Sequence, residues 1–459
     1  MTQTLHFATA YLPTGWASDV RITIGGLASG AGRIASVETG APALPGDDRH
    51  SIALPGLGNL HSHAFQRGMA GLAECRGQSD DSFWTWREVM YRFVERMGPD
   101  DLAAIAALAY VEMLETGFTR VGEFHYVHHD TQGRPYADPA AMSAAIARAA
   151  AETGIALTLL PVFYAHGGFG GQPATTGQRR FLHDIDGFAR LRDHAGRALA
   201  HLPDAVLGLA PHSLRAATPG QLSALVALAG DGAGDAPIHI HIAEQTREVD
   251  DCLAWSGARP VEWLFDNAPV DRRWCLVHAT HMTPAETRRL AQSGAVAGLC
   301  PITEANLGDG LFPALDYAGG AWGVGSDSNV MIDASEELRL YEYGQRLTRR
   351  GRNLLAPAPG ASTGAALFAS ALAGGARALG APSGIAVGHS ADIVTMNPDH
   401  PGLTARNGDA LIDGWVFAAG RGAIDCVWRN GTKVVSQGQH HAREAVVRRY
   451  RDTLARMLE

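Results

Sequence analysis

Hydrophobic and polar positions follow two different patterns along the 459-residue chain. Between about residues 55 and 384, short continuous apolar runs alternate with long stretches rich in Ala and Leu that have helical periodicity. Buried parallel strands read as continuous apolar runs, so this alternation predicts an α/β fold, a (β/α)8 TIM-like barrel. A doubly wound sheet is the weaker alternative, because no GxGxxG motif follows the first predicted strand. The eight runs are GLGNLHSH, TRVGEFHY, LTLLPVFYAH, VLGLAPHS, IHIHIAE, WCLVHATH, AVAGLCP and WGVGSDS.

The two ends of the chain carry shorter strand-like segments, broken by Gly and Pro. Residues 385–440 include GHSADIVTMN, WVFAAG and DCVWRNGTKVVSQG, and the Asn-Gly pair in the last of these is typical of a hairpin turn. We therefore expect residues 1–54 and 385–440 to combine into a small β-sandwich domain beside a barrel of residues 55–384. Residues 441–459 are arginine-rich and amphipathic, which predicts a C-terminal helix with a packed apolar face.

Charge and composition narrow the classes of partner and of chemistry. A net charge of -9 disfavours nucleic acid and anionic membranes as partners. The chain shows neither an apolar run long enough to cross a membrane nor a secretory signal at its start, so we expect a cytoplasmic protein. Five scattered cysteines without a CxxC pair are typical of reduced thiols. The single lysine, Lys433, excludes Schiff-base chemistry and a metal-bridging lysine from the central region.

Histidines and acids gather at the C-terminal ends of the predicted strands, where barrels build their active sites. His61 and His63 are two positions apart on the first strand and therefore share a face, as two ligands of one metal ion require. A pair of surface histidines is the simpler interpretation of this motif alone.

The fifth, sixth and eighth strands add further candidates. On the fifth, His241 lies nearer the strand end and suits a metal ligand, whereas His239 is better interpreted as a hydrogen-bonded core residue. Glu244 follows in the loop, as a proton shuttle beside a metal-bound water requires, or else as an acid in the first turn of a helix. His278 ends the sixth strand and Asp327 the eighth. An Asp in such a turn often caps a helix, but the four strand ends together predict a metal-dependent hydrolase.

The order HxH, HxxE, His and Asp resembles the amidohydrolase superfamily, in particular its branch of deaminases with one metal ion. The resemblance implies that Glu244 is the proton shuttle, that Asp327 takes a proton from the attacking water and that His278 lies beside this water. The implied cofactor is one zinc ion, although such a site also accepts iron or another divalent metal. Without a lysine on the fourth strand, the chain fits one metal ion rather than two. The implied metal ligands are His61, His63, His241 and Asp327.

Seven segments between about residues 55 and 330 resemble the family of formimidoylglutamate deiminases, which act in histidine degradation. This resemblance implies hydrolytic deimination of N-formimino-L-glutamate to N-formyl-L-glutamate and ammonia, by a homodimer. The segments are GLGNLHSHAFQRGMAG, SFWTWREVMYRF, GEFHYVHH, APHSLRA, HIHIAEQTREVDDC, LVHATHM and CPITEANLGDG. The implied substrate contacts are Gln66, Arg87, Tyr126, His212 and Arg215.

The implied small-molecule dicarboxylate substrate gives a reason to single out two of these residues. Guanidinium groups bind carboxylates bidentately, and a protein of net charge -9 needs local cations to hold a dicarboxylate. Arg87 lies in an aromatic-rich helical segment, and Arg215 just past the fourth strand; a surface salt bridge is the alternative for each. Another deaminase of this branch, acting on guanine, cytosine or an adenosine derivative, is the alternative enzyme. A catalytically silent metal-binding scaffold is the alternative from a different class.

Overall fold

The central barrel is built from short parallel strands, each at a continuous apolar run of the sequence. The computed structural model describes residues 2–27, 30–76, 82–230 and 236–459. Two parallel sheets meet edge to edge through parallel bridges between Leu209 and Ile238 and between Ser62 and Asp327, which closes the barrel. The fourth predicted strand is divided into two short pieces, β8 and β9. The strands are β5 (Leu57–Ser62), β6 (Phe118–His125), β7 (Ala156–Phe163), β8 (Val206–Leu207), β9 (Ala210–Pro211), β10 (Ile238–Ile242), β11 (Trp274–His278), β12 (Val296–Leu299) and β13 (Ala321–Val324).

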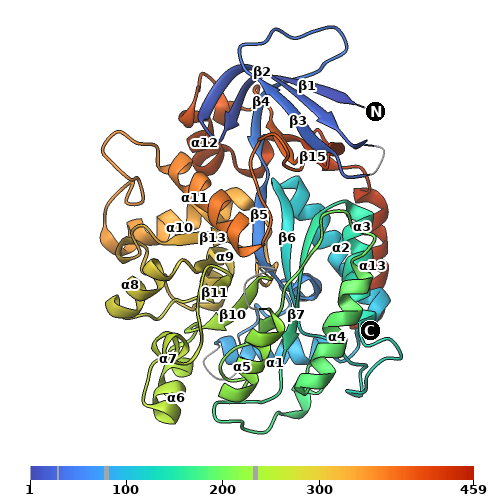
Figure 1. Cartoon of the computed structure of the whole chain (residues 1–459), viewed down its shortest axis with the longest axis vertical. Coiled ribbons are helices and arrows are strands. Elements are labelled where there is room, and N and C mark those ends of the chain that lie inside the picture. Colours follow the sequence, from blue (N-terminus) through green and yellow to red (C-terminus); the bar gives the residue numbers. More distant parts are fainter. Residues whose placement is uncertain (1, 28–29, 77–81, 231–235) are drawn as a thin grey trace.

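Helices surround this barrel and separate its strands in the sequence (Figure 1). Two of those described, α5 and α8, begin at a Thr cap followed by Pro; the Thr218 hydroxyl, for example, accepts a hydrogen bond from Gln221 N at 3.4 Å. The barrel interior is filled by small apolar side chains, among them Leu60, Val277 and Cys300. The helices are α1 (Phe83–Val94), α2 (Pro99–Glu115), α3 (Ala141–Thr153), α4 (Ile185–Ala198), α5 (Pro219–Leu228), α6 (Thr246–Ser256), α7 (Pro260–Asn267), α8 (Pro284–Ser293), α9 (Pro301–Leu307), α10 (Ala334–Arg349) and α11 (Thr363–Ala378).

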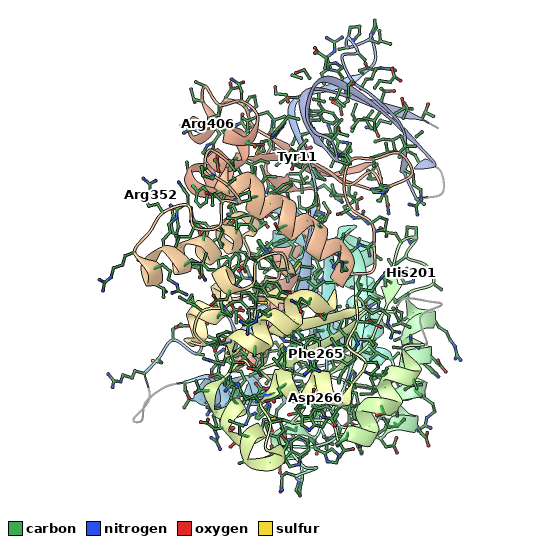
Figure 2. The ribbon with its side chains drawn as sticks, turned by 60° about the vertical axis from the view of Figure 1, so that its left-hand side comes forward. Tyr11, His201, Phe265, Asp266, Arg352 and Arg406 are labelled. Carbon is green, nitrogen blue, oxygen red and sulfur yellow. The ribbon has the colours of Figure 1, made fainter. Side chains whose placement is uncertain are left out.

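The two ends of the chain form one mixed sheet at one end of the barrel, separate from its strands (Figure 1). β4 pairs in parallel with β1 on one side and antiparallel with β14 on the other, which joins the N-terminal strands to the C-terminal ones. Tyr11 lies where this sheet meets the barrel helices, with its ring 5.8 Å from that of Phe368 in α11 (Figure 2). In spatial order the strands are β17 (Gln439–His440), β16 (Thr432–Ser436), β15 (Ile424–Arg429), β14 (Ile393–Met396), β4 (Asp48–Pro55), β1 (Gln3–Leu12), β2 (Gly15–Gly25) and β3 (Arg33–Glu38).

One predicted strand of this region is wrong. WVFAAG forms a π-helical turn, Trp415–Ala419, that continues the short helix α12 (Asp409–Gly414). Trp415 and Val416 are buried there, so the apolar run marks burial and not an extended backbone.

The predicted C-terminal helix is α13 (Arg443–Leu458), which packs along α2. It buries Val446 and Met457, and Arg456 forms an ion pair with Asp101 of α2. Within the described parts of the chain, no helix has both the length and the apolar character needed to cross a membrane.

Candidate active site

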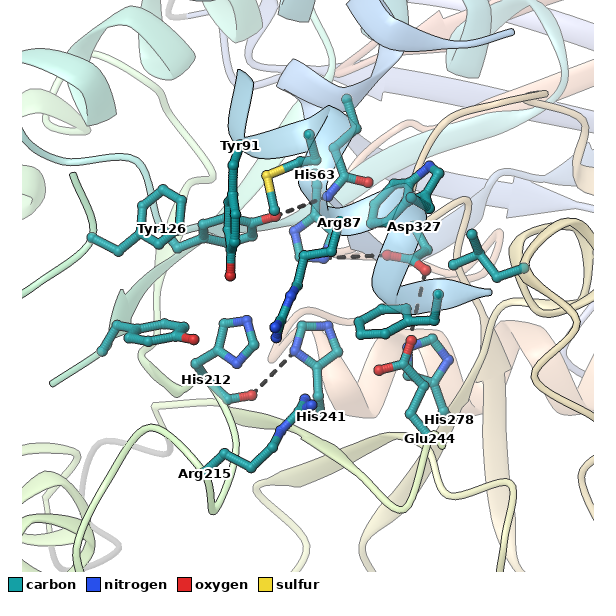
Figure 3. A pocket seen from close by; sticks show the side chains of 17 residues that line it. His63, Arg87, Tyr91, Tyr126, His212, Arg215, His241, Glu244, His278 and Asp327 are labelled. Carbon is teal, nitrogen blue, oxygen red and sulfur yellow. Dashed lines mark hydrogen bonds and ion pairs between the residues drawn. The ribbon is translucent and has the colours of Figure 1, made fainter. Parts of the chain in front are cut away.

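Three imidazoles converge at the carboxyl end of the barrel strands. His61 Nε2 lies 3.2 Å from His63 Nε2 and 3.0 Å from His241 Nε2. The Nδ1 atom of His63 lies 2.8 Å from the Phe124 carbonyl oxygen, and that of His241 lies 3.1 Å from the His212 carbonyl oxygen (Figure 3). A carbonyl only accepts, so Nδ1 of both rings carries the proton and Nε2 carries a lone pair. Lone pairs that face one another in this way suit a bound cation.

Asp327 completes this cluster from the end of the eighth barrel strand. Its Oδ1 atom lies 3.2 Å from His63 Nε2 and 3.4 Å from His61 Nε2. Although burial opposes it, the adjacent His61 and His63 imidazoles hold the pKa of Asp327 well below its usual range. Asp327 N also donates to the His61 carbonyl at 2.9 Å, which fixes the two strands side by side. The residues whose donor atoms all lie within 4.8 Å of one another are His61, His63, His241 and Asp327, a donor set that suits a divalent metal ion such as zinc.

His278 and Glu244 lie beside this cluster and contact each other. His278 Nε2 lies 3.8 Å from Glu244 Oε1 and 4.0 Å from Asp327 Oδ2, and His278 Nδ1 lies 3.2 Å from Glu304 Oε1. Burial alone would lower the pKa of His278, but the three surrounding carboxylates raise it to about 10. Burial raises the pKa of Glu244, against the opposing charges of His278 and Arg215. A carboxyl whose pKa is raised towards neutrality can both accept and donate a proton.

The backbone around these groups is strained. Ala243, His278, Ala279, Asp327 and Asn329 all have positive φ angles, between 43° and 67°. For residues other than glycine each such conformation costs on the order of 1–3 kcal/mol, and this kind of strain typically clusters at functional sites.

A pocket of roughly 580 Å³, including its open mouth, leads from solvent to these groups (Figure 3). Among the residues predicted from the sequence, His61 is fully buried and does not line the pocket, while the rest line its wall. Aromatic side chains fill much of the remaining wall. The predicted residues on the wall are His63, Gln66, Arg87, Tyr126, His212, Arg215, His241, Glu244, His278 and Asp327.

The polar side chains of the pocket leave several donors and acceptors without partners. Gln66 donates to Tyr126 Oη at 2.8 Å, but Gln66 Oε1, Arg87 Nε and Arg215 Nη1 are buried and make no hydrogen bond with the described part of the chain. Neither arginine forms a salt bridge there, which removes the surface salt bridge as an explanation. The Arg87 guanidinium lies 4.6 Å from the centre of the Trp84 ring, and that of Arg215 lies 5.8 Å from it. A guanidinium that lines a pocket and forms no salt bridge suits an anionic ligand.

Family comparisons agree with this geometry. The sequence pattern described as "Amidohydrolase family" matches residues 52–434, and that of "Formimidoylglutamate deiminase HutF, N-terminal domain" matches residues 2–51.

The chain belongs to the amidohydrolase family.

The formimidoylglutamate deiminase of Pseudomonas aeruginosa is 51% identical to this chain over 453 residues, which is 98% of each sequence. The crystal structure of an amidohydrolase from Brucella melitensis is 53% identical, with a TM-score of 0.95 over 100% of both chains. A 5-methylthioadenosine/S-adenosylhomocysteine deaminase of Natronomonas pharaonis is more distant, at 29% identity over 78% of this chain and 76% of that sequence.

Within this amidohydrolase, the structure adds two residues that the sequence reasoning missed. Glu304, in α9, accepts from both His278 Nδ1 and the Cys300 backbone N–H. Trp84, in α1, provides the ring on which the two pocket arginines stack. Both lie inside segments that carry the resemblance, CPITEANLGDG and SFWTWREVMYRF, but nothing in either segment shows which residue of another segment the side chain contacts.

Proposed function

We propose that the protein hydrolyses N-formimino-L-glutamate to N-formyl-L-glutamate and ammonia, with one zinc ion bound by His61, His63, His241 and Asp327. The observation that carries this proposal is a pair of arginines, the half-buried Arg87 and the buried Arg215, which share a pocket with the metal-ligand cluster and form no salt bridge with the described residues. Such a pair suits a substrate with two carboxylates, which a nucleobase or a nucleoside lacks. The 51% identity to a formimidoylglutamate deiminase over nearly the whole chain supports the same substrate.

The pocket separates the two ends of this substrate. The carboxylates would bind Arg87 and Arg215, while the formimino carbon would lie beside Glu244, His278 and Asp327. Gln66, Tyr126 and His212 would complete the contacts with the glutamate portion, because they line the same pocket. A bound divalent metal ion would supply Lewis acidity, lowering the pKa of a water molecule towards ~7.

The remaining steps are proton transfers by this chain's own side chains. Asp327 Oδ2 would accept the proton of the attacking water. Glu304 holds His278 through Nδ1, so that His278 Nε2 would stay directed at the attacking water and orient it. Attack on the formimino carbon gives a tetrahedral intermediate, and Glu244 would donate a proton to the nitrogen that leaves as ammonia. Collapse of the intermediate breaks the bond from carbon to this nitrogen and forms the carbonyl of N-formyl-L-glutamate, while the hydroxyl proton would pass to the Glu244 carboxylate.

Three further features belong to this proposal. Zinc is the metal that histidine and carboxylate ligands suit, although the same donors bind other divalent ions. The homodimer is implied by the family resemblance, and the cytoplasmic location is expected from the sequence pattern. Both stay predictions, which light scattering and cell fractionation would check.

The experiment is ammonia release by the zinc-loaded protein, offered N-formimino-L-glutamate beside guanine, cytosine and adenosine. Turnover of N-formimino-L-glutamate alone would support the proposal, and turnover of a nucleobase or nucleoside instead would overturn it. Glu244→Gln removes the proton donor but keeps the shape of the side chain. We expect it to retain its zinc and to lose about 10²- to 10⁴-fold in kcat, and a kcat near that of the parent would reject the role of Glu244.

A further inference from the structure

A second group of metal-ligand atoms lies against the first. One donor atom from each of His278, Cys300 and Asp327 lies within 4.8 Å of the other two, and all three residues are buried. They come from the ends of three neighbouring barrel strands, β11, β12 and β13, so the fold itself brings them together. None of the four ligands of the first group except Asp327 takes part.

The two oxygens of Asp327 face different neighbours. Oδ1 is the oxygen within 3.4 Å of His61 and His63, while Oδ2 is the one that lies 4.0 Å from His278 Nε2. A carboxylate in this orientation can ligate one ion through each oxygen. His278 Nδ1 is occupied by Glu304, which leaves Nε2 as the ligand atom of this imidazole.

The donor types and their spacing suit a soft or borderline divalent cation. Thiolate, imidazole and carboxylate are the three kinds of ligand that zinc takes, and cobalt and cadmium bind to the same kinds. Two ligand atoms on one tetrahedral zinc ion lie about 3.3–3.6 Å apart, given the usual bond lengths. The donors around Cys300 are therefore at most about 1.5 Å too far apart, a gap that small side-chain rotations close.

The surroundings of Cys300 carry an excess of buried carboxylates. Burial raises the pKa of the Cys300 thiol well above its usual value, and the negative charges of Asp327, Glu304 and Glu337 raise it further. Glu337 is fully buried, and its Oε1 atom makes no hydrogen bond with the described residues. Buried carboxylates with unpartnered oxygens favour an added positive charge.

We propose that Cys300, His278 and Asp327 form a second divalent-cation site, filled when metal is in excess, and that its occupant inhibits the enzyme. Binding releases the thiol proton to solvent and forms a bond from the cation to sulfur. The cation binds His278 Nε2, which would otherwise orient the attacking water, and Asp327 Oδ2, which would otherwise deprotonate it. The inhibition rests on the proposed function, whereas the binding does not.

Cobalt titration of metal-depleted protein tests the binding directly. The first site contains no sulfur, so a thiolate-to-cobalt charge-transfer band in the near ultraviolet reports only on a site with a cysteine. We expect this band to be absent after one equivalent of Co²⁺ and to grow with the second. Cys300→Ser and Cys300→Ala should lose the band and the second equivalent while keeping the first, as measured by metal analysis after gel filtration.

Two other cysteines provide matched controls. Cys275 is buried in the same barrel interior but belongs to neither group of ligands, so Cys275→Ala should keep the band. Cys426 lies near His50 and Asp425 in the terminal sheet, the other thiol-containing group among the described residues, and Cys426→Ala should also keep it. A band that persists in both Cys300 variants, a band lost only in Cys426→Ala, or a wild-type protein that never binds a second equivalent would overturn the proposal.

A second experiment tests the inhibition. For the wild-type protein and for each variant, it compares turnover at excess Zn²⁺ with turnover at one equivalent. For the wild-type protein, we expect turnover at excess Zn²⁺ to be severalfold lower than turnover at one equivalent. For both Cys300 variants, we expect the two rates to be nearly equal. Equal inhibition of wild type and variants would refute inhibition through this site. If N-formimino-L-glutamate is not turned over, the cobalt spectra still decide whether the second site exists, so the two failures are distinguishable.

Discussion

Replacing Arg215 with alanine tests the assignment of the pocket to a dicarboxylate. Arg215 is 9% exposed, forms no salt bridge with the described residues and keeps Nη1 without a hydrogen-bond partner. In the complex its guanidinium would bind one substrate carboxylate with two charge-assisted hydrogen bonds. Truncating one partner of such a buried pair costs about 2–5 kcal/mol, because the other charge is left in the pocket without a counterion. At 1.36 kcal/mol per tenfold, kcat/KM should fall by about 30- to 5,000-fold.

The assay is ammonia release under kcat/KM conditions, with Arg247→Ala as the matched control. The Arg247 guanidinium stacks on the same Trp84 ring, at 4.9 Å, but it lies outside the pocket, is 66% exposed and pairs with Asp251. Removing it should change kcat/KM by less than about fivefold, since exposed ion pairs contribute at most about 1 kcal/mol.

A substrate analogue without the side-chain carboxylate separates recognition from a general loss of structure. If Arg215 binds that carboxylate, the parent enzyme already turns the analogue over poorly, and Arg215→Ala should lower its kcat/KM little further. The reasoning fails if Arg215→Ala keeps the parent kcat/KM for N-formimino-L-glutamate, or if it harms both substrates equally while the protein stays folded by circular dichroism. The first result would remove the arginine from recognition, and the second would give it a role in the chemistry.

Three other predictions concern the surroundings of the pocket and the stability of the fold. Glu304→Gln keeps a hydrogen-bond acceptor for His278 but removes the negative charge, so kcat should drop about 10- to 100-fold and the pH–rate profile should shift. An unchanged pH–rate profile would show that Glu304 does not position His278. Removing the metal with a chelator should lower Tm, because a ligand present at 100 times its Kd adds about 2.7 kcal/mol to the free energy of unfolding. His241→Ala should lose most of this dependence of Tm on metal, and a full dependence in that variant would place the metal elsewhere. Burial lowers the pKa of His440 to about 4, against a hydrogen bond to Thr153 that raises it, so the unfolded chain binds more protons than the folded one between about pH 4 and 6.5. The free energy of unfolding should therefore fall as pH drops from 6.5 to 4, by up to about 3 kcal/mol from this group, and urea unfolding of His440→Gln should show a shallower slope; equal slopes would contradict it.

The barrel could be predicted because most of its parallel strands are buried on both faces and read as continuous apolar runs. His239 was predicted to be a core residue, and its Nε2 atom donates to the Ala378 carbonyl at 2.7 Å deep in the barrel. The segment Trp415–Ala419 shows the limit of this reasoning, since a short apolar run has the same composition whether it forms a buried strand or a buried helical turn. The Glu304–His278 contact could not be predicted for another reason: it joins residues 26 positions apart whose approach depends on the pairing of β11 with β12 and on the turn from β12 into α9.

The pairing of β4 with β14 has a consequence for how the chain is made. Pro55 of β4 lies opposite Ile393 of β14, and β5, with His61, begins two residues after Pro55. During synthesis, the N-terminal strands leave the ribosome long before their C-terminal partners exist, so β4 stays an open edge while the whole barrel is translated. The sheet that leads into β5, the strand with the metal ligand His61, is therefore complete only after β14 has been synthesised. A protein truncated after the barrel would still contain every residue of the pocket, yet it would expose a bare sheet edge beside β5, where aggregation competes with folding.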